Sequence, residues 1–253
     1  MSAPAPQLGL ASVLKALKLS GMLDTLEARL AEARAGRLGH AELLQVLCED
    51  ELARRDAAKV GRRLRAARLP MEATLEAFDF SYNPKIPAAQ VRDLARLEFI
   101  EAGQGLIIYG PVGVGKSHIA SALGHLACRR GYEVSFFACS HLLADLGGGH
   151  ADRSFAARLK RLSRPALLII DDWAMREFSA LQADDVYELI CERVGRPGRS
   201  LVLTSNRSPS DWYALFPNAV VGESVLDRVI NSSYHLLLDG KSYRPTRRPA
   251  RRS

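Results

Sequence analysis

The segment GPVGVGKS, residues 110–117, constrains the fold of this chain more than any other. It follows the apolar run GLIIY and precedes a stretch compatible with a helix, residues 117–130. A glycine, four residues and then Gly115, Lys116 and Ser117 form the phosphate-binding pattern G-x-x-x-x-G-K-[ST]. The alternative is a flexible turn beside a surface lysine, but chance produces the full pattern in roughly one chain of this length in a hundred. The segment therefore predicts a nucleotide-binding loop between a strand and a helix.

Each residue type in this loop has a physical task. Glycines let successive backbone N–H groups turn toward an anion, and the following helix N-terminus adds about half a positive charge. Lys116 would neutralise the β- and γ-phosphates, and the Ser117 hydroxyl would ligate Mg²⁺. We expect the phosphates to be held by Gly110, Pro111, Val112, Gly113, Val114, Gly115, Lys116, Ser117 and His118.

Five apolar runs predict a parallel sheet around this loop. Each is bounded by Gly, Pro, Ser, Asn or Asp, and helix-compatible stretches separate them. Such runs are typical of strands buried on both faces of an α/β domain. The five runs are GLIIYG, YEVSFFA, ALLIIDD, SLVLTSN and HLLLDG.

The first 70 residues or so have a different residue pattern, one typical of helices. Leucines from Leu10 onward recur at spacings of three, four and seven, which predicts amphipathic helices, and residues 41–70 predict another helix or a pair ending at Pro70. The segment FDFSYNPKIPAAQ, residues 78–90, is rich in Pro and aromatics and is interpreted as a linker. We predict a helical domain for DNA or partner binding at 1–75, an ATPase domain at 76–245 and a disordered basic tail at 246–253.

The charge of the chain indicates the class of its partner, and the distribution of apolar residues indicates its compartment. The net charge is +7, the pI is near 9.4, and Arg greatly outnumbers Lys, which favours a phosphate-rich partner such as nucleic acid. No signal peptide and no apolar stretch of about 18 residues is visible, so we expect a cytoplasmic protein with no membrane partner. The four cysteines and six histidines show no zinc-ligand spacing.

Polar side chains follow two of the predicted strands. ALLIIDD ends in Asp171 and Asp172, which we assign to the metal and to the attacking water; paired acids that merely begin a turn or cap a helix are the alternative. SLVLTSN ends in Asn206, placed to lie between the γ-phosphate and the water, or else an ordinary turn asparagine. Arg228, on a predicted helix, is either an arginine finger for an adjacent subunit or a solvated surface residue.

Two basic clusters predict contact with a duplex backbone, although charge runs are often only solvated faces. No base-reading motif accompanies them, so little sequence specificity is expected. The first cluster is Arg54, Arg55, Lys59, Arg62, Arg63, Arg65 and Arg68, and the second is Arg153, Arg158, Lys160, Arg161 and Arg164.

In combination, these motifs resemble the IstB-like ATP-binding helpers of bacterial transposition. GPVGVGKSH, LLIIDDW, LTSNR, LDR and DGKSYR occur in this order, and KALKLSGM and ATLEAFDFSYNP extend the resemblance over nearly the whole chain. The resemblance implies an initiator-type P-loop AAA+ fold with a helical insertion around 141–162 after the second strand. It also implies ATP-dependent assembly of a homo-oligomer on duplex target DNA and recruitment of a transposase.

Site residues carry over by position. Gly110, Gly115, Lys116 and Ser117 match Walker A, Asp171 and Asp172 match Walker B, Asn206 matches sensor 1, Arg228 matches the arginine finger and Arg244 matches the sensor-2-like arginine. Many relatives have Asp-Glu where this chain has Asp171-Asp172, which bears on how well the attacking water is held. Trp173 stands where a smaller or aliphatic residue is common, and the sequence offers no physical reason for it.

Three other functions share part of this pattern. A replicative helicase loader has the same kind of ATPase core and differs in its protein partner. An ATP-gated DNA-binding module with little hydrolysis is an alternative that the short side chain of Asp172 leaves open. A small-molecule kinase shares the phosphate loop but needs neither Arg228 and Arg244 nor two basic clusters.

Overall fold

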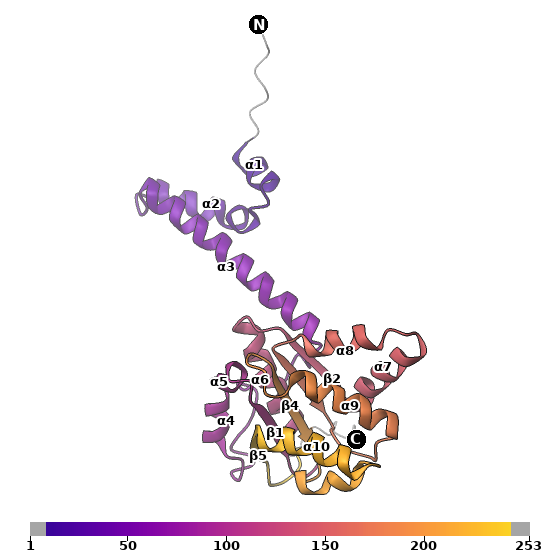
Figure 1. Cartoon of the computed structure of the whole chain (residues 1–253). Helices are drawn as coiled ribbons and strands as arrows, with labels where there is room; N and C mark the ends of the chain where they lie inside the picture. The colour runs from indigo at the N-terminus through magenta and orange to yellow at the C-terminus, as the bar shows by residue number, and fades with distance from the viewer. Residues whose placement is uncertain (1–8, 244–253) are drawn as a thin grey trace, which may run out of the picture. The chain divides into compact units, whose positions relative to one another are not determined.

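The computed structural model describes residues 9–243, and the chain divides into two units between Arg62 and Arg63 (Figure 1). The first unit contains the helices α1 (Leu10–Ala16) and α2 (Ser20–Arg34) and most of α3 (His40–Ala67). Where the sequence left one helix or a pair open, α3 is a single helix of 28 residues. The small core of this unit is formed by Leu14, Leu26 and Leu47, with Leu19, Met22, Leu30 and Leu43 packed against it.

Gly21 on α2 makes a close approach to α3. Its N–H donates to Glu51 Oε2 at 2.5 Å, and a Cβ at this position would lie 2.7 Å from Glu51 Cα. Burial acts to raise the pKa of Glu51, but hydrogen bonds from Arg54, Arg55 and the Gly21 amide outweigh it and lower the pKa to about 2. The pairing of α2 with α3 therefore requires a residue without a side chain at 21 and an ionised carboxylate at 51.

Gly21→Ala should loosen the helical unit. The added methyl group meets backbone atoms that cannot move aside, and overpacking of this kind costs roughly 1–3 kcal/mol. Hydrogen exchange of the α2 amides in the intact chain measures the free energy of opening for this region. Gly39→Ala is the matched control, because a Cβ there meets only Glu42 Oε2 at 3.7 Å. Equal protection in the two variants would contradict the close packing of α2 on α3.

The second unit is built on a five-stranded parallel sheet with the order β2-β3-β4-β1-β5, which confirms the predicted fold class. All five predicted strands are present. The fifth lies closer to the N-terminus than predicted: it ends at Leu237, and Gly240, with a φ of 128°, lies outside it. The strands are β1 (Gly105–Tyr109), β2 (Val134–Ala138), β3 (Leu167–Asp171), β4 (Ser200–Ser205) and β5 (Ser233–Leu237).

Helices cover both faces of the sheet (Figure 1). Alternate strand residues face opposite sides, so Ile107 packs with α7, α9 and α10, whereas Leu106 and Ile108 pack with α4, α5 and α6. The predicted helical insertion after the second strand is the pair α7 and α8. The helices are α4 (Ala88–Leu94), α5 (Glu98–Glu101), α6 (Lys116–Arg129), α7 (Cys139–Ala151), α8 (Phe155–Ser163), α9 (Ala180–Arg193) and α10 (Ala219–Asn231), with short 3-10 turns at Pro209–Asp211 and Tyr213–Leu215.

The end of α3 belongs to the second unit. Leu64, Ala67 and Leu69 pack into the core on the α6 face of the sheet. The functional boundary predicted between residues 75 and 76 stays a prediction, and the tail predicted at 246–253 lies outside the described residues. Between residues 9 and 243 no helix combines the length and apolarity needed to cross a bilayer.

The strand order determines where the polar loops meet. Tyr109 pairs with Ser205 across β1 and β4, and Ile170 pairs with Leu203 across β3 and β4. Because the strands are parallel, the carboxyl ends of β1, β4 and β3 lie next to one another at one edge of the sheet. The glycine-rich loop, Asn206 and the Asp171-Asp172 pair are therefore neighbours, although they are far apart in sequence.

Candidate nucleotide-binding site

The glycine-rich loop leaves β1 and ends at the first residue of α6. Gly110 has a φ of 140° and Gly115 a φ of 107°, which side-chain-bearing residues rarely adopt. A Cβ at Gly110 would lie 1.9 Å from the Leu238 carbonyl oxygen, and one at Gly115 would lie 2.6 Å from the Phe78 ring. These two positions require glycine, and the loop leads directly into the N-terminus of a 14-residue helix.

Lys116 holds its ammonium group against this loop. Its side chain is largely buried, and Nζ donates to the carbonyl oxygens of Gly110 at 2.8 Å and Pro111 at 2.7 Å. The N–H groups of the first helical turn have no intrahelical partner, and their partial positive charge adds to that of the ammonium. The loop therefore presents a positive potential suited to an anion.

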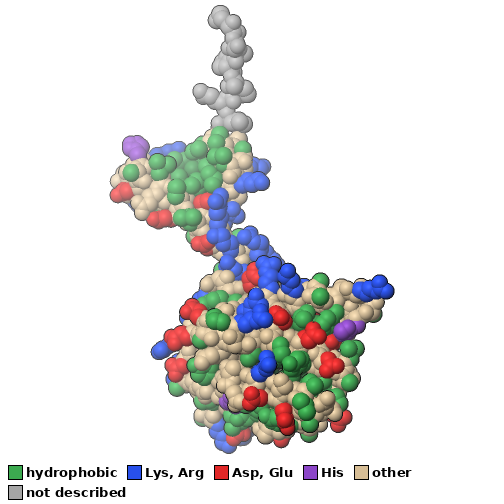
Figure 2. All heavy atoms as spheres, viewed as in Figure 1, with side chains coloured by type: hydrophobic (Ala, Val, Ile, Leu, Met, Phe, Trp, Pro, Cys, Tyr) green, Lys and Arg blue, Asp and Glu red, His purple; other side chains and the backbone are tan. Residues whose placement is uncertain are grey.

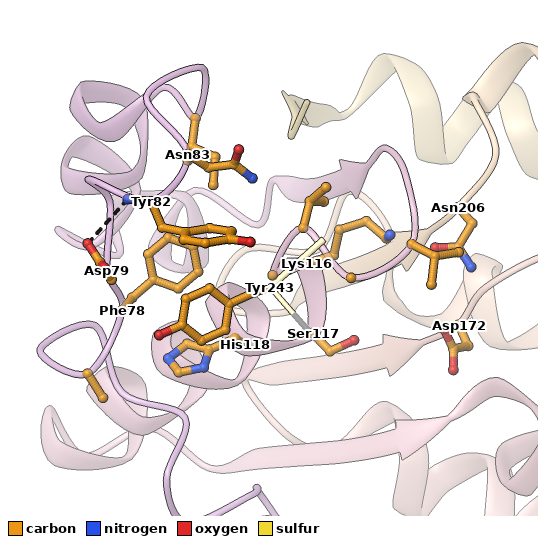
Figure 3. Close-up of a pocket in the computed structure, with 16 residues that line it drawn as sticks. Phe78, Asp79, Tyr82, Asn83, Lys116, Ser117, His118, Asp172, Asn206 and Tyr243 are labelled. Carbon is orange, nitrogen blue, oxygen red and sulfur yellow. Dashed lines mark hydrogen bonds between the residues drawn. The ribbon is translucent and has the colours of Figure 1, made fainter. Parts of the chain in front are cut away.

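A pocket of about 300 Å³ opens beside the loop (Figure 3). Aromatic side chains gather at one end, Asp172 and Asn206 lie at the other, and Lys116 and Ser117 lie between them. An apolar end, a cationic middle and a polar end suit a molecule with a flat ring and a phosphate chain. The lining residues are Ala77, Phe78, Asp79, Tyr82, Asn83, Ile86, Val112, Gly113, Val114, Gly115, Lys116, Ser117, His118, Asp172, Asn206 and Tyr243.

Thr204 on β4 organises the two acids at the polar end. Its buried hydroxyl donates to Asp171 Oδ1 and accepts from the Asp172 N–H at 3.1 Å. The Thr204 carbonyl oxygen accepts from the Trp173 N–H at 2.7 Å. These contacts hold Asp172 at a φ of 56°, a left-handed conformation in which Asp is more acceptable than most residues. The last strand residue and the following turn are therefore fixed by the neighbouring strand.

The structure gives a physical reason for the tryptophan at position 173, which packs in an aromatic part of the core. It is 1% exposed, with its ring centroid 5.3 Å from that of Phe178 and 6.1 Å from that of Trp212. The Ser205 hydroxyl donates to its carbonyl oxygen at 2.9 Å. The indole is buried in the core on the α9 face of the sheet, and it thereby anchors the turn that carries Asp172.

The remaining predicted site residues are distributed as follows. Gly110 and Pro111, at the start of the loop, and Asp171, the last residue of β3, do not line the pocket. Arg228 is exposed on α10, does not line the pocket and donates from Nη1 to Cys191 Sγ at 3.3 Å. Asn206 donates from Nδ2 to Met175 Sδ at 3.3 Å. Arg244 lies outside the described residues.

The aromatic end of the pocket was not predicted from the sequence. Phe78, Asp79, Tyr82, Asn83 and Ile86 come from the segment interpreted as a linker, and Tyr243 follows the last strand. The signal available was the density of aromatic and amide residues in FDFSYNP, unusual for a solvated connection. His118, predicted within the loop, joins this end: its Nε2 lies 2.7 Å from the Thr74 carbonyl oxygen and its ring centroid 5.2 Å from that of Phe78.

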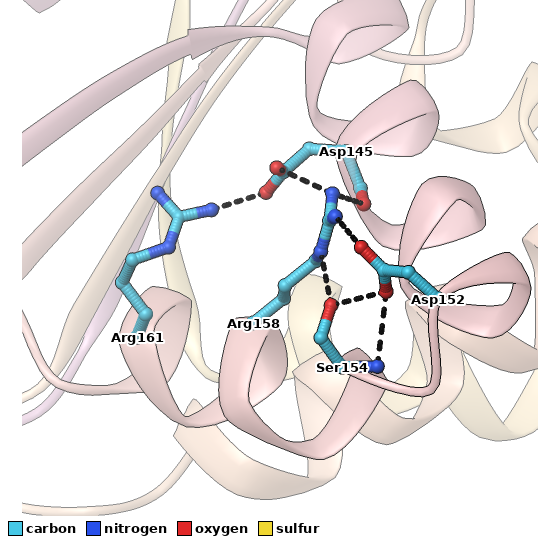
Figure 4. Close-up of polar contacts among 5 residues, drawn as sticks. All are labelled: Asp145, Asp152, Ser154, Arg158 and Arg161. Atoms are coloured by element: carbon cyan, nitrogen blue, oxygen red, sulfur yellow. Dashed lines mark hydrogen bonds and ion pairs between the residues drawn. The ribbon is translucent and has the colours of Figure 1, made fainter.

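The second basic cluster, on and beside α8, is largely neutralised by acids (Figure 4). Arg158 pairs with Asp145 at 3.2 Å and with Asp152 at 2.6 Å, and Arg161 also pairs with Asp145. Arg164 pairs with Glu133 at 3.2 Å. Only Arg153 and Lys160 of this cluster make no ion pair with a described residue, so it offers a polyanion less than its residue count suggests.

The first basic cluster keeps more of its charge. Figure 2 shows Lys and Arg side chains gathered along α3. Arg54 and Arg55 pair with Glu51, and Lys59 pairs with Asp56. Within residues 9–243, by contrast, no ion pair is formed by four arginines toward the end of the cluster, Arg62, Arg63, Arg65 and Arg68.

The donor set beside the loop fits Mg²⁺. This ion takes few protein ligands, chiefly one or two carboxylates, and completes its octahedron with water and phosphate oxygens. Ser117 offers a hydroxyl in the first turn of α6, and Asp171 offers a half-buried carboxylate, oriented by Thr204, at the end of β3, which β4 separates from β1. No group of three or more His, Cys, Asp or Glu side chains suited to a metal is found in the described part of the chain.

Nearly the whole chain also matches a known family. The family described as IstB-like ATP binding protein matches residues 12–250. The chain belongs to this IstB-like family. It is 57% identical over 242 residues to an insertion-sequence ATP-binding protein of Mycobacterium tuberculosis, with 96% of each chain covered. It is 34% identical to the ATP-binding protein of insertion sequence IS21 from Pseudomonas aeruginosa, covering 92% of this chain and 87% of that one.

Solved structures of other proteins share the fold of the second unit. The DnaC helicase loader covers 67% of this chain and 98% of its own, with a TM-score of 0.57 at 22% identity. DnaI covers 68% and 95%, with a TM-score of 0.58 at 18% identity. These similarities establish the P-loop AAA+ fold that the sequence resemblance implied.

Proposed function

We propose that this chain is an ATP-dependent, DNA-binding transposition helper that assembles on duplex target DNA, regulates and recruits a transposase, and hydrolyses ATP. The observation that carries the proposal is the pocket that joins the Lys116 loop to Asp172 and Asn206. Its aromatic end suits an adenine ring and its cationic middle a triphosphate. Relatives named for insertion sequences support transposition as the process, and the proposed compartment is the cytoplasm.

The residues of the site divide the work of hydrolysis. Lys116 and the amides of the loop neutralise the phosphate chain, and Ser117 and Asp171 would hold Mg²⁺. When bound, the ion neutralises charge that develops on the phosphate oxygens. Asp172 would accept a hydrogen bond from the attacking water, and Asn206 would hold that water against the γ-phosphate. Arg244 is proposed to contact the same phosphate.

A second copy of the chain completes the site in this proposal. Arg228 does not line the pocket of its own chain and is exposed on α10. A guanidinium supplied by a neighbour would tie hydrolysis to the formation of a homo-oligomer.

The duplex is proposed to lie along α3. An α-helix fits against the phosphate backbone or within the major groove of B-DNA. Arginines without acid partners can contact phosphates without first losing an ion pair. Contacts with phosphates carry no sequence information, so the binding would be largely independent of sequence.

Charge reversal distinguishes the two basic clusters. The Arg62→Glu/Arg65→Glu variant should weaken duplex binding at least about tenfold and reduce the salt slope by roughly two. Fluorescence anisotropy of a labelled duplex over a salt series measures both quantities. The matched control is Arg153→Glu/Lys160→Glu on and beside α8, which changes the same amount of charge without breaking an ion pair. A larger loss in the control would move the DNA site to α8.

Phosphate release with and without duplex DNA tests the function as a whole. DNA-dependent turnover is expected; ATP binding with no turnover above background would favour a binding module that uses ATP only to assemble. Co-purification separates the partners, since retention of replicative helicase rather than transposase would favour a helicase loader. The fold shared with DnaC is compatible with either partner.

A further inference from the structure

Residues 238–243, which follow β5 and are called the strap below, lie against the glycine-rich loop. The Leu238 N–H donates to the Tyr109 carbonyl oxygen at 2.9 Å, and the Tyr243 N–H donates to the Gly113 carbonyl oxygen at 2.9 Å. Gly113 has a φ of 83°, and a Cβ there would lie 2.1 Å from Ser242 Oγ. The strap therefore contacts the glycine-rich loop at its start and in its middle.

Asn83 joins this strap to the segment that carries the aromatic end of the pocket. Its Oδ1 accepts from the Lys241 N–H at 2.9 Å, and its Nδ2 donates to the Lys241 carbonyl oxygen at 2.9 Å. The side chain thus pairs with one backbone residue in both directions, and residue 83 is only 6% exposed. An amide side chain offers a donor and an acceptor in this geometry, whereas an ionised carboxylate offers acceptors alone.

Two further contacts join the same segments. The Tyr82 hydroxyl donates to the Ser242 carbonyl oxygen at 3.0 Å, and the Tyr82 and Tyr243 rings meet edge to face at 4.8 Å. A Cβ on Gly240 would lie 2.1 Å from Asn83 Oδ1, so the strap approaches Asn83 as closely as glycine permits. Tyr82, Asn83 and Tyr243 all line the pocket (Figure 3).

We infer that Asn83 is a positioning residue for the nucleotide site, acting as a clasp that holds Tyr82 and Tyr243 together across the strap and so keeps the aromatic end of the pocket closed. The inference rests on the proposed nucleotide site and extends it to two segments outside the matched phosphate-binding motifs. Without the clasp, the phosphate loop keeps Lys116 and Ser117, while the surfaces available to the base separate. Affinity for the nucleotide then falls because ordering these segments costs free energy on binding.

Asn83→Asp tests the clasp with almost no change in shape. The ionised carboxylate faces the Lys241 carbonyl oxygen with no donor, so ATP affinity should fall roughly tenfold, as expected for a lost buried hydrogen bond. Protonation restores an O–H donor, so the ratio of variant to wild-type affinity should recover as the pH is lowered from 8 to 5. A general loss of structure would not recover in this way. Isothermal titration with ATP and Mg²⁺ at both pH values measures the ratio.

Lys85→Ala is the control, because Lys85 and Asp239 pair at 3.0 Å between the same segments but are exposed. Its ATP affinity should stay within about twofold of wild type. Tyr82→Phe removes one hydroxyl contact, keeps the ring and should weaken ATP binding a fewfold, which tests the clasp even if Asn83→Asp does not fold. Wild-type affinity in both Asn83→Asp and Tyr82→Phe, or an Asn83→Asp loss that is independent of pH, would overturn the inference. No ATP binding by the wild-type chain would instead overturn the proposed function.

Discussion

Lys116→Ala should abolish ATP-dependent clustering of the protein on duplex DNA. The buried ammonium lies in the middle of the pocket, where it donates to the Gly110 and Pro111 carbonyl oxygens. An alanine leaves the phosphates with loop amides alone, and lost charge-assisted hydrogen bonds of this kind reduce ATP affinity at least about 100-fold. Titration with ATP measures the affinity, and electron microscopy or sedimentation with duplex DNA measures the clusters.

Two comparisons make this result specific. Lys160→Ala, on the exposed face of α8, should bind ATP and form clusters as the wild type does. The weak duplex binding of Lys116→Ala without nucleotide should match that of wild type without nucleotide, because the α3 arginines are untouched. Normal clusters formed by Lys116→Ala would show that assembly does not depend on nucleotide binding, and the coupling proposed through Arg228 would be wrong.

The sequence predicted the parts of the fold that depend on short-range patterns. The loop, the five strands and the acids at the end of β3 are each encoded within ten residues or so. Parallel pairing then brings the ends of β1, β3 and β4 together whichever side chains lie between them. The strand order was not predicted, because apolar runs of similar composition do not identify their neighbours.

Features that depend on distant contacts were missed. Asn83 and Lys241 are far apart in the chain, and nothing in either segment alone indicates that they pair. The arginines on and beside α8 were counted as free charge because their acid partners, such as Asp145 and Glu133, lie elsewhere in the sequence. Counting basic residues in a sequence therefore overstates the charge available to a polyanion unless the ion pairs are known. In the same way, a segment interpreted as a linker can line a pocket when it is rich in aromatic residues.

Thr204→Val should reduce ATP turnover roughly 10- to 100-fold while leaving ATP affinity within about threefold of wild type. Valine keeps the shape but removes the hydroxyl that donates to Asp171 and accepts from the Asp172 N–H. The phosphate loop lies between β1 and α6 and does not contact this hydroxyl, so we expect ATP binding to be spared. The turn at Asp172 loses a contact that offsets its left-handed backbone, and the loss in rate corresponds to about 1.4–2.7 kcal/mol of barrier. Phosphate release at saturating ATP measures the effect.

Thr204→Ser separates this role from core packing. Serine restores the oxygen but removes the methyl group, so a packing defect would persist in it, whereas a hydrogen-bonding defect would be repaired. Turnover should return to within a fewfold of wild type, and the Mg²⁺ concentration for half-maximal rate should be raised in Thr204→Val alone, because Asp171 loses its orienting donor. Equal turnover in Thr204→Val and wild type would mean that the buried hydroxyl does not hold the two acids in their working positions. In that case Asp172 would keep its left-handed conformation through the Trp173 anchor, whose indole packs against Phe178 and Trp212 independently of the hydroxyl.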